Sequence, residues 1–218
     1  MKKIIMLTMM ATLLIYGCQQ ENEEVYSCDK RLNEWAHRNL DAIRSMDREA
    51  WLQLDEDYKR PAFNALTPEQ KLLFWKDKLK EVMASFNWSD GEMKHLIKLY
   101  QYLEEHPDLY TEESLNDSIQ NETFANFVRQ WKDDAIVNLN WTEEQIYGMA
   151  CTGNRMINKE GTYAVIHKKR SQTKVEYINT PDCNCQTKYD PNCAKGNCKE
   201  VWGGIIIREE KYDGYKKN

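Results

Sequence analysis

The chain has no apolar segment after residue 16 that is long enough to cross a bilayer as a helix, which takes about 20 residues. It also lacks the H-E-x-x-H motif of zinc peptidases, the G-x-S-x-G motif of serine hydrolases and a glycine-rich phosphate-binding loop. Nothing next to Cys151 indicates the site of a cysteine protease. We therefore expect no catalytic residues and no cofactor, and we predict a protein that is not an enzyme.

Positive charge is scarce in most of the chain. Residues 18–158 contain 16 Lys and Arg against 27 Asp and Glu, whereas residues 159–218 contain 12 against 8. Phosphate contacts need a positive surface, so the acidic part argues against a nucleic-acid partner. The change of sign coincides with a change in cysteine content, which indicates two modules. The cationic part suits an anionic membrane surface, but it is equally typical of a solvated β-module.

Histidine is also scarce, with four residues in the chain. Glu34-x-x-His37 and Glu92-x-x-His95 have the spacing of half-sites in di-iron helical bundles. Helical geometry predicts that Glu34 and His37 lie away from the apolar face of their helix, and that His95 faces away from Leu96 and Tyr100. Metal ligands in a bundle point inward, so no metal site is predicted from these pairs.

The first 17 residues have the layout of an export signal. Two lysines precede an apolar run from Ile4 to Tyr16, which is followed by Gly17 and Cys18. A small residue before a cysteine resembles the lipobox of bacterial lipoproteins. The resemblance implies that residues 1–17 are removed and that Cys18 is lipidated, with palmitate among its acyl chains. An ordinary secretory signal that ends at a cysteine is the alternative.

Residues 18–28 are polar and acidic, and they predict a tether. Acidic residues directly behind the lipidated cysteine resemble the surface-export signal of Bacteroidetes lipoproteins. The resemblance implies an outer-membrane lipoprotein that faces the outside of the cell. A generic solvated linker is the alternative, so the periplasmic and surface faces both stay open. In either case the membrane is a partner through the N-terminal lipid, because each buried CH₂ contributes ~0.8 kcal/mol.

Residues 29–150 predict four or five amphipathic helices and a mainly α fold. The first covers about 30–48, and the fourth lies within about 115–138. Three others begin at S/T-x-x-E/Q capping boxes, at Thr67, Ser89 and Thr142, and Pro107 ends the helix that starts at Ser89. Because the connections are short, we expect an antiparallel helical bundle.

Residues 151–218 predict a small Cys-rich antiparallel β-module. Residues 162–166 and 174–178 have strand composition, the polar stretch 167–173 between them is typical of a hairpin turn, and Val201–Arg208 is a candidate third strand.

Cysteines are concentrated between the second and third of these strands. Cys183, Cys185, Cys193 and Cys198 lie there, and Cys28 and Cys151 complete an even set of six besides the lipid-bearing Cys18. An even number in an exported protein indicates disulfides, because the extracytoplasmic space is oxidising. Cys183 and Cys185 are too close in sequence to pair without strain.

The sequence leaves two questions about these cysteines open. Cys28 and Cys151 either pair with each other or are buried thiols. The four cysteines between Cys183 and Cys198 offer a tetrahedral thiolate site for structural zinc as an alternative to disulfides. Their spacings of one and four residues depart from the usual C-x2-C pairs, and export favours oxidation.

Two stretches resemble the bacteriocin fulvocin C-related proteins. One runs from Phe63 through Thr67-Pro68-Glu69-Gln70-Lys71 to Leu79, and the other is Cys183-Asn184-Cys185 with the following cysteine. The resemblance covers roughly residues 60–200 and implies an exported, non-enzymatic protein whose Cys-rich tail has an antibacterial role. This chain ends differently, in Ile205-Ile206-Ile207-Arg208 and a charged Tyr-Lys segment.

The sequence thus predicts an envelope lipoprotein in four parts: a signal peptide at 1–17, an acidic tether at 18–28, a helical domain at 29–150 and a Cys-rich β-module at 151–218. The alternative function is a cell-surface module that binds a protein or a glycan. The third hypothesis is an enzyme whose site is assembled from residues that are distant in sequence. In the first two cases the envelope or target-cell partner is unknown.

Overall fold

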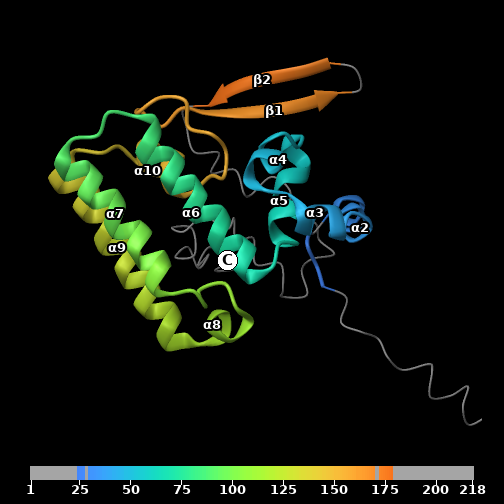
Figure 1. The fold of residues 1–218 in the computed structure, drawn as a ribbon, viewed down its shortest axis with the longest axis horizontal. Helices are drawn as coiled ribbons and strands as arrows, with labels where there is room; N and C mark the ends of the chain where they lie inside the picture. Colours follow the sequence, from blue (N-terminus) through green and yellow to red (C-terminus); the bar gives the residue numbers. More distant parts are fainter. Residues whose placement is uncertain (1–23, 28, 170–171, 179–218) are drawn as a thin grey trace, which may run out of the picture.

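The computed structural model describes residues 24–27, 29–169 and 172–178. This part of the chain is mainly helical, as predicted, and a β-hairpin follows the helices (Figure 1). Its elements are α2 (Lys30–Arg38), α3 (Leu40–Ser45), α4 (Arg48–Leu52), α5 (Glu56–Asn64), α6 (Pro68–Ser85), α7 (Asp90–Glu105), α8 (Glu112–Asn116), α9 (Ser118–Leu139), α10 (Glu143–Ala150), β1 (Tyr163–Lys169) and β2 (Gln172–Ile178).

The three predicted capping boxes are confirmed. The side chains of Thr67, Ser89 and Thr142 each accept a hydrogen bond from the backbone N–H three residues later, and the residue at that position bonds back in each case. These reciprocal bonds satisfy N–H groups that a helix start leaves open. They begin α6, α7 and α10 at the positions read from the sequence.

Helices α6, α7 and α9 pack antiparallel to their neighbours. Between α6 and α7, Lys76 Nζ lies 3.0 Å from Glu104 Oε1, so the middle of α6 meets the end of α7. Between α7 and α9, the stacked rings of Tyr102 and Phe127 have centroids 3.9 Å apart. Near the other end of this pair, Trp131 Nε1 donates to the carbonyl of His95. Figure 1 shows α7 and α9 side by side along their lengths.

The predicted helix over residues 30–48 is wrong, because the structure divides this stretch into α2, α3 and the start of α4. Asn39 separates the first two with φ −113° and ψ 17°, and its side-chain amide donates to the carbonyl of Trp35. Asp47 then caps α4 by accepting from the N–H of Ala50. Asn and Asp compete for backbone groups in this way, which ends helices locally.

Two further helices were not expected as separate elements. The sequence predicted no helix over α5, which contains Pro61 and is capped by Asp55. The predicted 115–138 helix is α9 with different ends, because Asp117 accepts from the N–H groups of Ile119 and Gln120 and divides α8 from α9.

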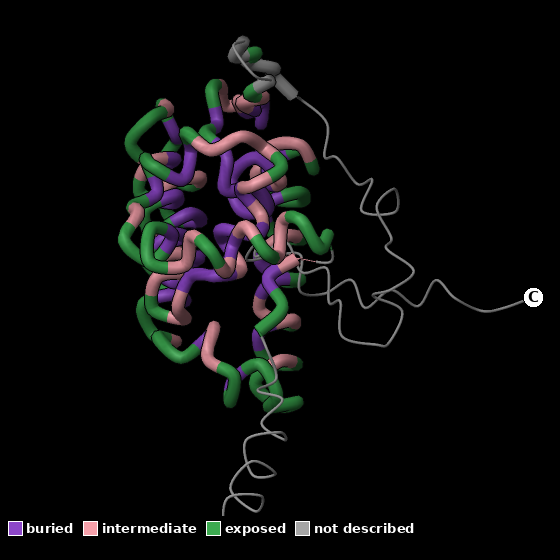
Figure 2. The backbone as a smooth tube through the Cα atoms, turned by 90° about the vertical axis from the view of Figure 1, so that its right-hand side faces the viewer, coloured by how far each residue is buried: buried purple, intermediate pink, exposed green. Residues whose placement is uncertain are grey.

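Buried side chains form one continuous core inside the helical part. Figure 2 shows buried backbone running through the interior, with exposed segments around it. Trp51, Phe63, Phe74 and Trp75 contact one another edge to face near the middle of this core. Each such contact stabilises the fold by about 0.5–1.5 kcal/mol beyond the contribution of the apolar area that it buries.

The predicted hairpin is confirmed for its two strands. β1 and β2 pair antiparallel from Tyr163↔Ile178 to Lys169↔Gln172, so they extend further than predicted and leave a two-residue loop. Figure 1 shows β1 on the side of α4 and α5, and β2 beyond it. Val201–Arg208 and the cysteines from Cys183 onward lie outside the described residues.

No helix in the described ranges is both long enough and apolar enough to span a bilayer.

Candidate functional site

The helical part of the structure, called the body from here on, has a cluster of buried polar side chains around the segment that follows α10. Asn154 is 1% exposed, and charged side chains from three earlier helices surround it. Arg48 comes from α4, Lys59 from α5 and Lys78 from α6. We call Arg48, Lys59, Lys78 and Asn154 the Asn154 clamp. Burial without partners would cost several kcal/mol per charged group, so the contacts within the clamp decide whether this arrangement is stable.

Lys59 binds the side chain of Asn154. Its Nζ donates to Asn154 Oδ1 at 2.5 Å and lies 3.1 Å from Glu56 Oε2. Burial lowers the pKa of the Lys59 amine, and the nearby Glu56 carboxylate partly opposes this effect. Asn154 Nδ2 in turn donates to Glu56 Oε1 at 3.3 Å. The three side chains therefore form a closed polar group inside the core.

Lys78 binds the backbone of the same residue. Its Nζ donates to the carbonyl oxygen of Asn154 at 2.5 Å, and its side chain is fully buried. Burial, together with the positive charge of Arg48, holds the pKa of Lys78 well below its ordinary value. Lys59 and Lys78 therefore fix both the side chain and the peptide carbonyl of Asn154.

Arg48 extends the clamp by one residue. Its guanidinium donates to the Gly153 carbonyl at 3.0 Å and to Glu81 Oε2 at 2.6 Å. Arg155 also reaches Glu81 Oε2, at 3.3 Å. Burial raises the pKa of the Glu81 carboxyl, but the hydrogen bond and charge of Arg48 outweigh it, so the net shift is downward.

Close packing explains why residue 153 is a glycine. A Cβ there would lie 2.7 Å from Phe74 Cζ and 2.7 Å from Trp51 Cη2, which are buried ring atoms. These distances are shorter than van der Waals contact allows, so only glycine lets the backbone approach the two rings. Gly153 thus lies against Trp51 and Phe74, and the carbonyls of Gly153 and Asn154 accept hydrogen bonds from Arg48 and Lys78, respectively.

The clamp is not arranged as an active site. The Lys59 and Lys78 amines are both 0% exposed and already bind the chain itself. In the described ranges, no group of three His, Cys, Asp or Glu side chains is placed to hold a metal ion. What the clamp does chemically is to tie the segment before β1 to α4, α5 and α6.

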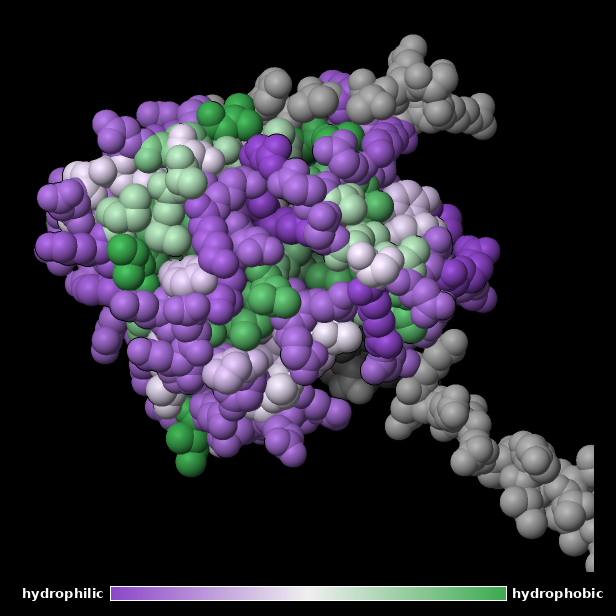
Figure 3. Space-filling model, viewed as in Figure 1, coloured by the Kyte–Doolittle hydropathy of each residue, from purple (hydrophilic) through white to green (hydrophobic). Residues whose placement is uncertain are grey.

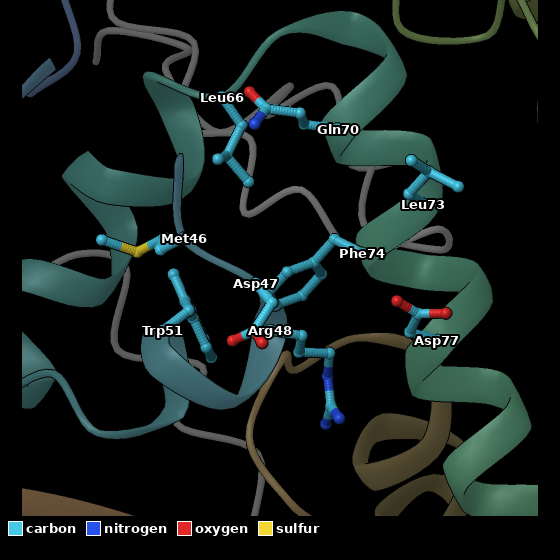
Figure 4. Close-up of a pocket in the computed structure, with 9 residues that line it drawn as sticks. All are labelled: Met46, Asp47, Arg48, Trp51, Leu66, Gln70, Leu73, Phe74 and Asp77. Atoms are coloured by element: carbon cyan, nitrogen blue, oxygen red, sulfur yellow. The ribbon is translucent and has the colours of Figure 1, made fainter. Parts of the chain in front are cut away.

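A shallow hollow of about 200 Å³ lies beside the clamp, between α4 and α6 (Figure 4). Its walls are mainly apolar, and Asp47 and Asp77 bring two carboxyl groups to its lining, here called the rim carboxylates. Leu73, which is 55% exposed, extends the apolar surface outward. Arg48 Nε is buried and has no hydrogen-bond partner among the described residues. Figure 3 shows the face that is turned to the viewer in Figure 1 as mostly hydrophilic, with separate apolar patches.

The structure places one of the predicted disulfide cysteines. Cys151 is buried directly after α10, and its N–H donates to the carbonyl of Tyr147. Cys18, Cys28 and the four cysteines from Cys183 to Cys198 lie outside the described residues. The pairing of Cys28 with Cys151 therefore stays a prediction, as do the lipid at Cys18, the disulfides and the alternative zinc site.

The predicted orientation of His95 is wrong. Its ring is 5% exposed, stacks on Trp131 with centroids 4.7 Å apart, and has Nε2 2.9 Å from the Trp131 carbonyl oxygen. Burial lowers the pKa of this imidazole. The buried face of α7 includes Leu96, Leu99 and Tyr102, so it is rotated away from Tyr100, one of the two residues from which His95 was predicted to face away. This rotation brings His95 inside.

Glu92, the other member of this pair, is partly buried and binds two side chains from later in the chain. Its carboxylate accepts from Lys159 Nζ at 2.8 Å and from Trp141 Nε1 at 3.1 Å. Burial raises the pKa of Glu92, but the Lys159 ammonium and the other donors outweigh it and lower the value to about 2. Lys159 thus ties the segment before β1 to the start of α7.

Sequence reasoning missed the clamp. Lys78 occupies the apolar stripe of α6, one turn after Trp75 and one turn before Val82, and all three side chains are buried. Lys59 is likewise one turn before Phe63 on α5. A charged residue at a stripe position was the available signal, because long amines placed there either reach solvent or need a buried partner.

The chain matches no protein-family model, no curated protein and no solved structure. The resemblance to bacteriocin fulvocin C-related proteins therefore stays a prediction.

Replacing Lys78 with Met should reduce the rise of stability with pH. The pKa of this amine is lower in the folded chain than in the unfolded chain, so the unfolded chain holds more protons between the two values. Stability therefore rises with pH in that interval, by up to about 1.4 kcal/mol per pH unit for each such amine. Urea unfolding between about pH 7 and pH 9.5 measures this slope.

Lys80→Met, at an exposed position of the same helix, is the control and should keep the slope of the unmodified chain. An unchanged slope in Lys78→Met would show that the buried amine does not titrate as described.

Proposed function

We propose that this protein is a non-enzymatic lipoprotein of the cell envelope, in which the helical body carries a Cys-rich tail. The proposal begins with the layout of residues 1–18, a short apolar run between a positive start and Gly17-Cys18. Lipidation at Cys18 anchors the chain in the outer membrane, and residues 18–28 separate the body from the lipid. An anchored tail that acts on neighbouring cells requires the body to face the outside, whereas the anchor itself is compatible with either face.

One structural observation supports the role of the body as a carrier. The Asn154 clamp and Lys159 fix the segment before β1 to four helices, and the chain then continues through the hairpin toward the cysteine-bearing residues. A tail attached at this point is carried on a segment that is bound at several buried positions. Such an attachment suits a tail that acts while it is still joined to the anchored body.

The tail itself is proposed to be a Cys-rich antiparallel β-module. Residues 179–218 contain few large apolar groups apart from Trp202 and Ile205–Ile207, so cross-links would supply what a small core does not. Disulfides among Cys183, Cys185, Cys193 and Cys198 contribute about 2–4 kcal/mol for each loop that they close. Structural zinc at the same four residues is the alternative. Following the resemblance to fulvocin C-related proteins, the proposed activity of this tail is antibacterial.

Metabolic labelling with a palmitate analogue tests the anchor. The full chain, expressed in a Bacteroidetes host, should carry the label and fractionate with the outer membrane, because Cys18 receives the acyl chains. Cys18→Ala should lose the label, and Cys28→Ala is the matched control that should keep it. Label retained in Cys18→Ala, or absent from the full chain, would refute the lipoprotein.

A chain truncated after Ile178 separates the anchor from the tail in the same experiment. It should keep the palmitate label and lose any killing of neighbouring strains that the full chain shows. Killing that survives the truncation, or no killing by the full chain, would leave the anchor intact and refute the antibacterial tail.

The hollow between α4 and α6 favours a second candidate function, a module that binds a protein partner. Leu73 is the exposed apolar residue there, and the rim carboxylates of Asp47 and Asp77 suit a partner residue with an apolar stem and a cationic end. If the hollow is the binding surface, Leu73→Asp should reduce retention of an envelope partner at least about tenfold, equivalent to 1.4 kcal/mol. Leu115→Asp, at an exposed site on α8, should retain it. Equal retention by both variants would refute this site.

A further inference from the structure

We propose that Val201–Arg208 pairs with the edge of β2 that faces away from β1 and forms the third strand of the sheet. The inference deepens the proposed Cys-rich module and rests on that part of the proposed function, but it needs neither lipidation nor killing. It follows from the register of the hairpin, which decides which strand edge is still open.

The register determines the direction of every backbone N–H in the hairpin. Lys169 pairs with Gln172 across a two-residue loop, and in such hairpins the pair next to the loop exchanges both hydrogen bonds. The pairs then alternate along the strands. In β1, the N–H groups of Ala164, Ile166 and Lys168 consequently point away from β2.

Contacts of β1 with the body agree with this geometry. The N–H of Ala164 donates to the Arg155 carbonyl at 3.0 Å, and the N–H of Lys168 donates to Asp55 Oδ2. The Lys168 side chain also binds the Gln53 carbonyl. The edge of β1 that faces away from β2 is therefore already covered by the segment after α10 and by the residues between α4 and α5.

Among the described residues, the edge of β2 that faces away from β1 is the strand edge on which another strand can pair. By the same alternation, the N–H and C=O groups of Thr173, Val175 and Tyr177 point away from β1. Within the described ranges the sheet has two strands, and Figure 1 shows β2 on its outer side. An isolated two-stranded ribbon is marginally stable, and an open edge is a template for a further strand.

The chain itself supplies a suitable occupant. Val201–Arg208 contains Ile205-Ile206-Ile207, a β-branched run with high strand propensity. The 22 residues from 179 to 200 lie between it and the end of β2. At ~3.3 Å per residue they are ample to return along a seven-residue strand. Because these residues contain the four clustered cysteines, cross-links there would also shorten the return path.

Amide hydrogen exchange on the full mature chain tests the pairing. The amides of Thr173, Val175 and Tyr177 should exchange at least about tenfold more slowly than exposed amides, because a third strand accepts their hydrogen bonds. Cross-strand nuclear Overhauser effects should also connect these residues to 204–207. Lys174 and Glu176, whose amides face β1, are the internal reference and should be protected in any case.

A proline variant links the protection to the proposed segment. Ile206→Pro should restore fast exchange at Thr173, Val175 and Tyr177 and leave Lys174 and Glu176 protected, whereas Ile206→Thr should behave as the unmodified chain. The cross-strand effects in the unmodified chain keep the test decisive if the proline variant does not fold.

Three outcomes would overturn the inference. Fast exchange at the three edge residues of the unmodified chain means an open edge. Protection that depends on protein concentration means that a second copy covers it. Protection that survives Ile206→Pro with no effects to 204–207 means that another segment does so. None of these readings involves the palmitate label or the killing assay, so failure here is distinguishable from failure of the anchor or of the antibacterial role.

Discussion

The fold depends on two buried amines that bind one asparagine. Lys59 and Lys78 come from different helices and hold the side chain and the carbonyl of Asn154, respectively. If the segment at Asn154 moved away, Lys59 would keep only Glu56 and Lys78 would lose its carbonyl acceptor, and without the amines the segment after α10 would lose its main polar contacts. Helices α5 and α6 and the approach to β1 are therefore stabilised together, because each supplies groups that the others need.

This coupling joins two parts that the sequence separates by charge and composition. The boundary read at residue 151 coincides with the end of α10, yet the residues that follow pack into the helical core and bind Arg48, Lys59, Lys78 and Glu92. β1 also packs on the helices, because Tyr163 and Val165 are buried and the backbone of Lys168 binds Asp55. A tail that follows this hairpin is therefore attached to a segment that the whole body stabilises.

How much could be predicted depended on whether the signal was local. The capping boxes at Thr67, Ser89 and Thr142 involve residues three apart, so they placed the starts of three helices correctly. The breaks at Asn39 and Asp117 depend on side chains that can either continue or end a helix, and the sequence does not decide between these outcomes.

The inward positions of Lys59, Lys78 and His95 depend on partners 36 to 95 residues away, which no local pattern contains. The sequence rules treat lysine as solvent-facing, and the rule is usually correct because buried lysines need a partner. The sequence likewise did not indicate why residue 153 is a glycine, since the requirement comes from close contact with two rings on α4 and α6.

The most direct test of the central claim is a double-mutant cycle between Lys59 and Asn154, with unfolding free energies measured in urea at neutral pH. Lys59→Met and Asn154→Leu should each destabilise the chain by about 2–4 kcal/mol, because the first leaves Asn154 Oδ1 without its donor and the second leaves the buried Lys59 amine with Glu56 alone. The double variant should lose less than the sum by at least about 1.5 kcal/mol, since both partners are then apolar. Losses that add to within about 0.5 kcal/mol would contradict a clamp at this position.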